Sequence, residues 1–222
     1  MQLSVVIPTL DEAERITQSV SSAVGGADEV LVVDGGSRDG TPERAEAAGA
    51  RVISSTPGRA RQLGIGAEAA RGDVLLFLHA DTRLPSGWDA GVRHALADPD
   101  VVGGAFRFRF DERTLVLRLL EWGTRLRVAL LRLPYGDQAL FVRRSVLDAI
   151  GGLPQVPIME DLDLVAALKR RGRLVLLTLP ATTSARRYRE RGPLRTAARN
   201  MLAALAWACG RDRARIAAWV RR

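Results

Sequence analysis

The sequence predicts an α/β fold in which helices cover both faces of a mostly parallel sheet. Short strand-like runs alternate with helical stretches through the first hundred residues. Two of these runs, EVLVVD (29–34) and VLLFLH (74–79), are apolar at nearly every position, as in strands buried on both faces. The composition, 47% hydrophobic and 26% charged over 222 residues, is that of an ordinary globular chain. One large α/β domain is therefore expected.

In the first half, β-branched or apolar runs predict the strands and helical spacing predicts the segments between them. Ile16 and Val20 share one helix face, and Thr41-Pro42 is a typical helix start. The expected strands are Ser4–Pro8, Glu29–Asp34, Arg51–Ser54 and Val74–His79. The expected helices are Asp11–Val24, Thr41–Ala48, Gly58–Ala70 and Trp88–Ala97. This alternation is typical of parallel strands joined by crossover helices.

The second half is less regular. The expected strands are Val101–Phe110, Ala139–Arg143 and Leu174–Leu179. The expected helices are Leu115–Leu133, Ser145–Ile150, Asp161–Arg171, 194–209 and 212–220. We find no repeat and no linker long enough to divide the chain, so a single domain over residues 1–222 is expected.

Several protein classes are disfavoured by composition. Cys209 is the single cysteine, so no intrachain disulfide can form and a reducing compartment is expected. No apolar run approaches the ~20 residues that span a bilayer. The N-terminus lacks the basic region and cleavage site of a secretory signal. We therefore expect a cytoplasmic protein.

The charge is unevenly spread. Residues 169–222 hold 15 basic and 2 acidic residues, a net of +13, whereas residues 1–168 hold 18 and 23, a net of −5. A basic tail suits nucleic acid, anionic lipid or an anionic ligand. It also fits a compositional bias, because every basic residue except Lys169 is arginine. Few aromatic residues accompany these arginines, so no nucleic-acid partner is expected.

Polar residues follow three of the expected strands. They are Thr9 to Glu12, Asp34 with Gly35, and His79 to Asp81, while Glu160 and Asp161 open a later helix. Each acid alone suits a helix cap or a turn. Because parallel strands end at one sheet edge, where ligands of α/β folds bind, their joint placement favours a site. Carboxylates there suit Mg²⁺ or Mn²⁺ with a diphosphate.

These residues form a pattern: VVIPTLDE (5–12), VVDGGSRDGT (32–41), LHADT (78–82) and MEDLDL (159–164). In this order and spacing the chain resembles the family 2 glycosyltransferases of GT-A type over roughly residues 1–185. GDQALFVRR (136–144) and TSARRYRERG (183–192) add a resemblance to a small bacterial subgroup with HADT in place of the usual Asp-x-Asp. The resemblance implies inverting, Mg²⁺- or Mn²⁺-dependent transfer of a sugar from a nucleotide-diphosphate sugar to an acceptor hydroxyl.

The resemblance also assigns regions and residues. Residues 1–100 would form the nucleotide-binding half, 101–192 the acceptor and catalytic half, and 193–222 a basic helical tail. Asp161 would be the catalytic base, supported by Glu160. The nucleotide-sugar site would comprise Pro8, Thr9, Glu12, Asp34, Gly35, Arg59, Arg61, Ala80 and Asp81. The acceptor-side candidates are Gly136, Asp137 and Gln138, and the metal candidates are Asp81 and, in a supporting role, His79.

The chain departs from the family pattern at His79, which stands where the first acid of Asp-x-Asp is usual. His79 would assist Asp81 at a metal, or it would be a hydrogen-bonded structural residue. Arginines near 186–191 would neutralise the diphosphate, or they would form a solvated basic loop. Gly64, Gly66 and Ala69 match G-x-G-x-x-A, but they continue a helix already begun, so no nicotinamide site is expected.

The acceptor and two alternative functions stay open. Residues 115–133 and the C-terminal stretch mix apolar residues with arginines, which suits burial, an acceptor platform or an anionic membrane. Because family members often use lipid-linked acceptors, a weak peripheral contact with the inner face of a membrane is expected. A sugar-phosphate nucleotidyltransferase would need a Gly-rich basic loop where Thr9 to Glu12 stand. An inactive nucleotide-sugar-binding module is the other alternative, and the replacement of an acid by His79 favours it.

Overall fold

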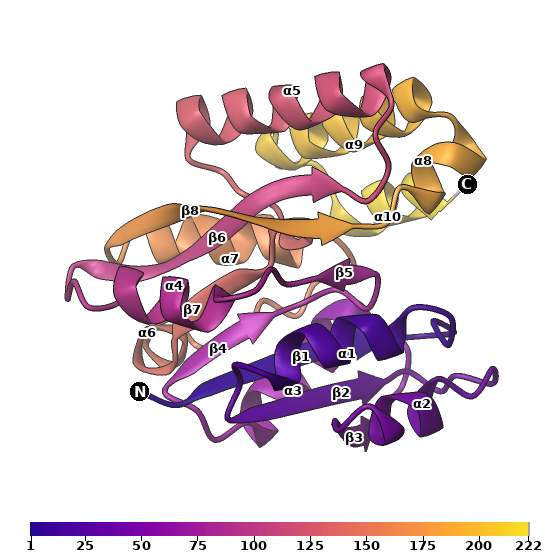
Figure 1. Cartoon of the computed structure of the whole chain (residues 1–222). Helices are drawn as coiled ribbons and strands as arrows, with labels where there is room; N and C mark the ends of the chain where they lie inside the picture. The colour runs from indigo at the N-terminus through magenta and orange to yellow at the C-terminus, as the bar shows by residue number, and fades with distance from the viewer. Residues whose placement is uncertain (222) are drawn as a thin grey trace.

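The computed structural model describes residues 1–221, without the side chain of the last of them, and contains one sheet with helices on both faces (Figure 1). The sheet has eight strands in the order β3-β2-β1-β4-β7-β6-β8-β5. The strands are β1 (Leu3–Thr9), β2 (Glu29–Asp34), β3 (Arg51–Ser54), β4 (Val74–Phe77), β5 (Thr82–Arg83), β6 (Val101–Phe110), β7 (Leu140–Arg143) and β8 (Arg173–Thr183). The predicted α/β class is confirmed.

Helices separate most of these strands along the chain. They are α1 (Ile16–Val24), α2 (Thr41–Ala47), α3 (Arg59–Ala69), α4 (Trp88–Ala95), α5 (Leu115–Leu131), the 3₁₀ turn η1 (Gly136–Gln138), α6 (Arg144–Ala149), α7 (Glu160–Lys169), α8 (Arg186–Arg191), α9 (Pro193–Ala208) and α10 (Arg213–Arg221). β1 pairs in parallel with β2 and β4, and β6 pairs in parallel with β8. β7 lies antiparallel between β4 and β6 and thereby joins the two halves of the sheet.

Two apolar layers, one on each face of the sheet, form the core. Ile7 of β1 packs in the layer that holds α1, α2 and α4, and its neighbour Val6 packs in the layer that holds α3, α6 and α7. This alternation follows from the two-residue side-chain period of a strand. Gly66 of α3 faces Val6 so closely that a Cβ at residue 66 would collide with it. The G-x-G-x-x-A stretch therefore serves close packing of α3 on the sheet.

The structure differs from the sequence prediction at several boundaries. α1 begins at Ile16 and not at Asp11, because Asp11 has a φ of 52° and the chain turns before the helix. β8 continues to Thr183 because it follows β6 along its whole length after a register shift beyond Phe106. β5 and α8, which connect the sheet to the C-terminal helices, were not predicted.

The C-terminal helices bury Ala203 and Ile216 and are also joined to the body through one acid. Asp163 Oδ1 on α7 accepts a hydrogen bond of 2.7 Å from Trp207 Nε1 on α9 and another of 2.7 Å from Arg213 Nη2 on α10. The basic tail is therefore packed on the fold. Within the described residues, no helix is both long and apolar enough to cross a membrane.

Candidate functional site

Two adjoining cavities lie at the carboxyl ends of β1 and β4, next to the first turn of α7. The larger has a volume of about 670 Å³ and the smaller about 200 Å³. Both are lined by Arg59, His79, Asp81 and Arg187. Residues that are far apart in the sequence thus meet at the sheet edge where α/β folds bind ligands.

The smaller cavity gathers residues from the loop after β1. Pro8, Thr9, Glu12 and Ala80 line it. The Thr9 hydroxyl is buried and has no hydrogen-bond partner within the described residues, so it is available to a ligand. Glu12 Oε1 accepts a hydrogen bond of 2.7 Å from Arg186 Nη2, which ties α8 to this loop.

Asp34 and Gly35 lie at the end of β2 and line neither cavity. The carboxylate of Asp34, which is 5% exposed, accepts hydrogen bonds from the backbone of Gly36 and Ser37, both at 2.9 Å, and one of 2.5 Å from the Ser37 hydroxyl. The Gly35 amide donates to the Thr9 carbonyl at 2.9 Å. In this structure the two residues shape the loop beside Thr9, and the Asp34 carboxylate accepts three hydrogen bonds from its own turn.

Arg59, at the start of α3, connects three of the expected site residues. Its Nε donates to Glu160, its Nη2 lies 3.5 Å from Asp161 Oδ1, and its Nη1 lies 3.3 Å from His79 Nε2. Glu160 is 2% exposed, so its charge depends on this arginine. The two acids raise the pKa of Arg59 against the effect of its burial. Arg59 therefore fixes the first turn of α7 to the end of β4.

Asp161 projects from α7 towards η1. Its Oδ2 accepts a hydrogen bond of 2.7 Å from the Gly136 amide, and its Oδ1 accepts one of 3.0 Å from the Leu162 amide. A Cβ at residue 136 would lie 3.1 Å from Asp161 Oδ2 and 3.2 Å from His79 Nε2. Glycine at 136 thus allows the loop to approach the carboxylate.

Asp137 is the one expected acceptor-side residue that lines the larger cavity. Its Oδ1 is buried and has no hydrogen-bond partner within residues 1–221. Burial, together with the nearby Asp161 and Asp81, raises the pKa of Asp137 to about 6, although Arg127 opposes the shift. Gln138 points inward, where its Nε2 donates to the Phe106 carbonyl at 3.0 Å.

His79 and Asp81 differ in their availability for a metal. Burial and the charges of Arg59 and Arg187 hold the pKa of His79 well below its usual range, so the ring is neutral at pH 7. The neutral ring accepts from Arg59 through Nε2, which favours a structural role for His79. Asp81 forms no ion pair within the part of the chain that the structure describes, and its one side-chain hydrogen bond, from Thr82, is 3.4 Å long.

The side chains at this site suit a divalent cation that is held partly by the protein and partly by a bound ligand. Among the described residues, no three His, Cys, Asp or Glu side chains form a metal-binding group. Mg²⁺ is commonly bound by one or two carboxylates together with substrate phosphates, and it does not require a complete protein cage. Asp81, at the junction of both cavities, provides one such carboxylate.

Sequence reasoning missed several residues of the larger cavity. Tyr135 lines it, and the Arg127 guanidinium lies 3.2 Å from the centre of the Tyr135 ring. Arg199 and Asn200 of α9 also line it. No motif marks these positions, because they reach the cavity through the packing of α5 on β6 and of α9 on α5. Arg61 also lines this cavity and donates to the Thr56 hydroxyl.

The profile of the family described as "Glycosyl transferase family 2" matches residues 4–153, more than half of the chain. The chain belongs to glycosyl transferase family 2. The matched stretch carries Thr9, Glu12, Asp81 and Asp137. Asp161 and Arg187 lie beyond the match and are placed at the cavities by the fold.

Two curated relatives are similar to this chain, and in each of them the similarity covers only part of the relative's length. Glucosyl-3-phosphoglycerate synthase of Mycolicibacterium paratuberculosis is 41% identical over 96 residues, 37% of this chain and 29% of that protein. Undecaprenyl-phosphate 4-deoxy-4-formamido-L-arabinose transferase of Pseudomonas paraeruginosa is 30% identical over 165 residues, 67% of this chain and 49% of that protein. The chain thus matches less than a third of the first relative and about half of the second.

Solved structures share the fold over nearly the whole chain. Glucosyl-3-phosphoglycerate synthase from Mycobacterium tuberculosis, in complex with Mn²⁺ and UDP-glucose, has a TM-score of 0.69 and 25% identity, and the match covers 95% of this chain and 79% of that one. A mannosyltransferase from Pyrobaculum calidifontis with GDP-mannose and Mn²⁺ has a TM-score of 0.67 at 22% identity, covering 91% of this chain and 62% of that one. At this identity, the similarity to the mannosyltransferase concerns the fold alone.

Proposed function

We propose that this chain transfers a sugar from a nucleotide-diphosphate sugar to an acceptor hydroxyl, with Mg²⁺ or Mn²⁺ as its cofactor. The observation that carries the proposal is the position of Asp81 and Asp161 on one cavity of about 670 Å³, next to a smaller cavity at the end of β1. Family membership and the nucleotide-sugar complexes of the structural neighbours support it.

The smaller cavity suits the nucleotide, with the unpartnered Thr9 hydroxyl available to it. The diphosphate then lies at the junction of the cavities, between Asp81 and Arg187. A divalent cation held by Asp81 would neutralise charge on the departing nucleotide diphosphate. Arg187 lines both cavities and has no ion pair among the described residues, so its guanidinium is free to contact phosphate oxygens.

The larger cavity suits the sugar and the acceptor. In a single displacement, the acceptor oxygen forms a bond to the anomeric carbon as the bond from that carbon to the diphosphate oxygen breaks. The acceptor proton passes to Asp161, and the nucleotide diphosphate leaves. Arg59 and the Gly136 amide hold the Asp161 carboxylate at the cavity wall. We assign Glu160 a positioning role, because it fixes Arg59.

We also propose a lipid-linked acceptor and a peripheral position at the inner face of a membrane. One relative is named for transfer to undecaprenyl phosphate, so its acceptor is carried on a lipid; that lipid reacts through a phosphate oxygen, whereas the reacting group proposed here is a hydroxyl. The larger cavity supports this acceptor class because Phe108, Tyr188 and Val220 add apolar surface to its polar lining. Such a mixed wall suits an amphipathic molecule better than a fully polar one.

An inactive nucleotide-sugar-binding module is the second candidate. One observation favours it: His79 replaces an acid, and its Nε2 is engaged by Arg59. A binder of this kind would retain the nucleotide cavity but would release no nucleotide diphosphate. The two candidates therefore differ in turnover and agree in binding.

The test is release of nucleotide diphosphate from a panel containing UDP-glucose and GDP-mannose, with and without Mn²⁺. We expect Mn²⁺-dependent release that Asp161→Asn reduces by at least about a hundredfold, as for loss of a general base, while thermal-shift binding of the donor persists. Asp148→Asn, an exposed acid on α6, is the matched control. Binding without release in the wild type would support the inactive module, and unchanged release in Asp161→Asn would remove Asp161 from this role.

A further inference from the structure

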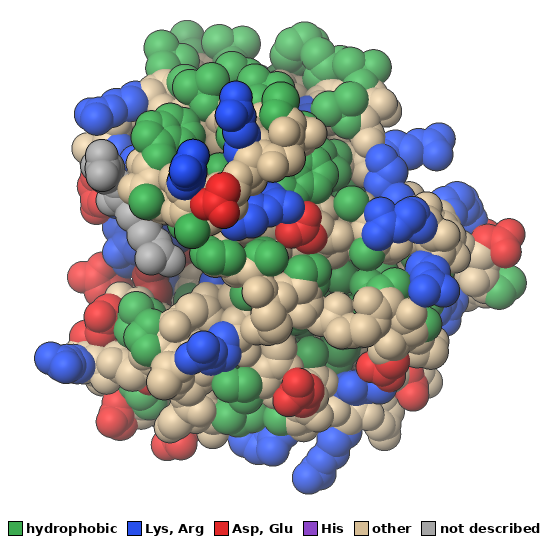
Figure 2. Space-filling model, turned by 180° about the vertical axis from the view of Figure 1, so that it is seen from behind, with side chains coloured by type: hydrophobic (Ala, Val, Ile, Leu, Met, Phe, Trp, Pro, Cys, Tyr) green, Lys and Arg blue, Asp and Glu red, His purple; other side chains and the backbone are tan. Residues whose placement is uncertain are grey.

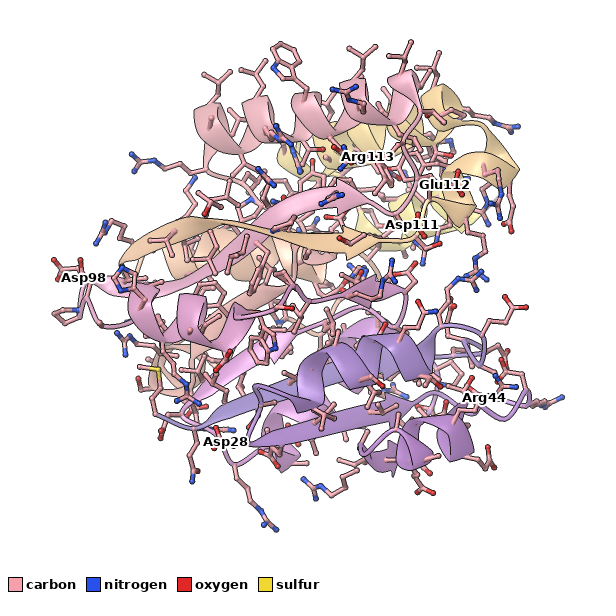
Figure 3. All side chains as sticks on the ribbon, viewed as in Figure 1. Asp28, Arg44, Asp98, Asp111, Glu112 and Arg113 are labelled. Carbon is pink, nitrogen blue, oxygen red and sulfur yellow. The ribbon has the colours of Figure 1, made fainter. Side chains whose placement is uncertain are left out.

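A broad apolar surface lies on α5 and α9, on the side of these helices that faces away from the sheet. We call it the α5–α9 face. Its large hydrophobic side chains are between 43% and 78% exposed. They are Leu115, Leu119, Trp122, Leu126 and Leu130 on α5, and Leu194, Met201, Leu202 and Leu205 on α9. In Figure 2 hydrophobic side chains gather at the top of the molecule, where Figure 1 places α5. In Figure 3 the side chains of α5 point away from the sheet.

The face is a regular helical stripe and not a loose scatter of residues. The five positions on α5 follow one another at intervals of three or four, which places them on one side of the helix. The buried side of α5 holds Leu117 and Val128. α5 and α9 contact one another, so their exposed stripes lie at the same end of the molecule. Contiguous apolar surfaces of this kind mark interaction sites.

The charges on this face have a single sign. Glu121 is the one acid in α5 and α9, and it is 7% exposed and accepts a hydrogen bond of 2.8 Å from the Phe110 amide. Arg118, Arg125 and Arg195 are exposed, and none has an ion pair within the described residues. On α5 the two arginines lie along one edge of the apolar stripe, because they are seven residues apart in a helix.

We propose that the α5–α9 face docks on the surface of an anionic lipid bilayer. Apolar side chains enter the boundary between headgroups and acyl chains, and the flanking arginines contact lipid phosphates. A second copy of the chain suits the face less well. A two-fold interface would bring the arginines of both copies into one interface, with no exposed acid on the α5–α9 face to compensate their charge.

The proposal gives α9 a function on both of its sides. Leu202 and Leu205 belong to the α5–α9 face, while Thr196, Arg199 and Asn200 line the larger cavity. A helix with its side chains is about 10 Å across. Docking would therefore hold the larger cavity close to the bilayer surface. This last step rests on the proposed function, because docking on the bilayer matters for the reaction only if the acceptor is carried in the lipid. Docking would then bring that acceptor to the larger cavity.

The experiment is co-sedimentation of the full chain with phosphatidylglycerol-containing vesicles and with pure phosphatidylcholine vesicles, at low and high salt. The test variant is Leu119→Gln with Leu126→Gln. The control is Val24→Gln with Leu176→Gln, which removes two hydrophobic side chains elsewhere on the surface whose exposure is close to that of Leu126. Circular dichroism checks that both variants fold, and nucleotide-diphosphate release in the absence of vesicles checks the site.

We expect salt-sensitive binding to the anionic vesicles that the test variant weakens by at least about tenfold, as expected for two lost apolar anchors, while the control binds like the wild type. Absence of wild-type binding at low salt would overturn the proposal. So would equal binding by both variants, or a dimer that the test variant dissociates without any vesicle binding. Vesicle binding without release of nucleotide diphosphate would contradict the proposed function and would still support the docking surface.

Discussion

Replacing Arg59 with alanine should destabilise the fold far more than removal of an ordinary surface arginine. The side chain of Arg59 is 38% exposed, but its partner Glu160 is 3% exposed and lies at the first turn of α7. Removing one partner of a buried ion pair costs about 3–5 kcal/mol, because the other charge is left without compensation. Since water reaches the Arg59 side, we expect about 2–3 kcal/mol for Arg59→Ala.

Arg93 provides a matched comparison. Its side chain is 39% exposed, and it pairs at 3.4 Å with Asp28, which is itself 47% exposed and is labelled in Figure 3. Exposed pairs contribute about 1 kcal/mol or less. Arg93→Ala should therefore have a small effect. The two variants differ most in the burial of the carboxylates left behind, because Arg59 also lies near Asp161 whereas the second contact of Arg93 is the Met1 carbonyl.

Urea denaturation followed by circular dichroism measures both free energies of unfolding. In thermal unfolding, about 2–3 kcal/mol corresponds to a fall in Tm of roughly 4–12 °C for a domain of this size. Adding Glu160→Gln to Arg59→Ala should recover part of the loss, because a neutral amide replaces the stranded charge. Equal destabilisation by Arg59→Ala and Arg93→Ala would refute the reasoning, as would a double variant that is less stable than the single one.

Three further predictions concern titration and the C-terminal helices. Because the pKa of Asp137 is raised to about 6 from 3.8, its contribution to stability is present at low pH and is lost as pH rises through 6; Asp137→Asn should therefore gain stability relative to the wild type between pH 4 and 7, by at most about 3 kcal/mol, and a flat difference in urea denaturation would contradict this. Because the pKa of His79 lies well below its usual range, its NMR resonances should still be those of a neutral ring at pH values where an ordinary histidine is already protonated, and a His79 midpoint near the ordinary value of about 6.5 would be inconsistent with burial beside Arg59. Asp163→Asn weakens two charge-assisted hydrogen bonds, so hydrogen exchange in α9 and α10 should accelerate with that in α3 unchanged, and equal protection in both proteins would show that these bonds do not hold the tail.

Local sequence signals predicted much of the fold. The strands of the first half were found because each is a short apolar run bounded by turn residues, and neighbouring parallel strands bury both faces. β5 and α8 were missed because they are short and depend on β8 for their position. The boundary of α1 was wrong because a capping interpretation of Asp11 does not reveal its positive φ.

The candidate site was only partly predictable. Asp81 and Asp161 face one cavity, as strand-end and helix-start acids suggest. Asp34 instead uses its carboxylate in its own turn, which the Asp-Gly-Gly-Ser sequence equally allows. The pairing of Arg59 with Glu160 joins residues 101 positions apart, so no local pattern contains it. Long-range side-chain contacts of this kind follow from the packing of α3 against α7.

The most direct test of the central claim is calorimetric titration of UDP and GDP into the wild type, Asp81→Asn and Asp148→Asn, each with and without Mn²⁺. We predict that Mn²⁺ strengthens binding of a nucleoside diphosphate to the wild type and to Asp148→Asn, and that Asp81→Asn abolishes this gain. Nucleoside diphosphate binding that depends on neither Mn²⁺ nor Asp81 would contradict a metal-assisted diphosphate site at the junction of the two cavities.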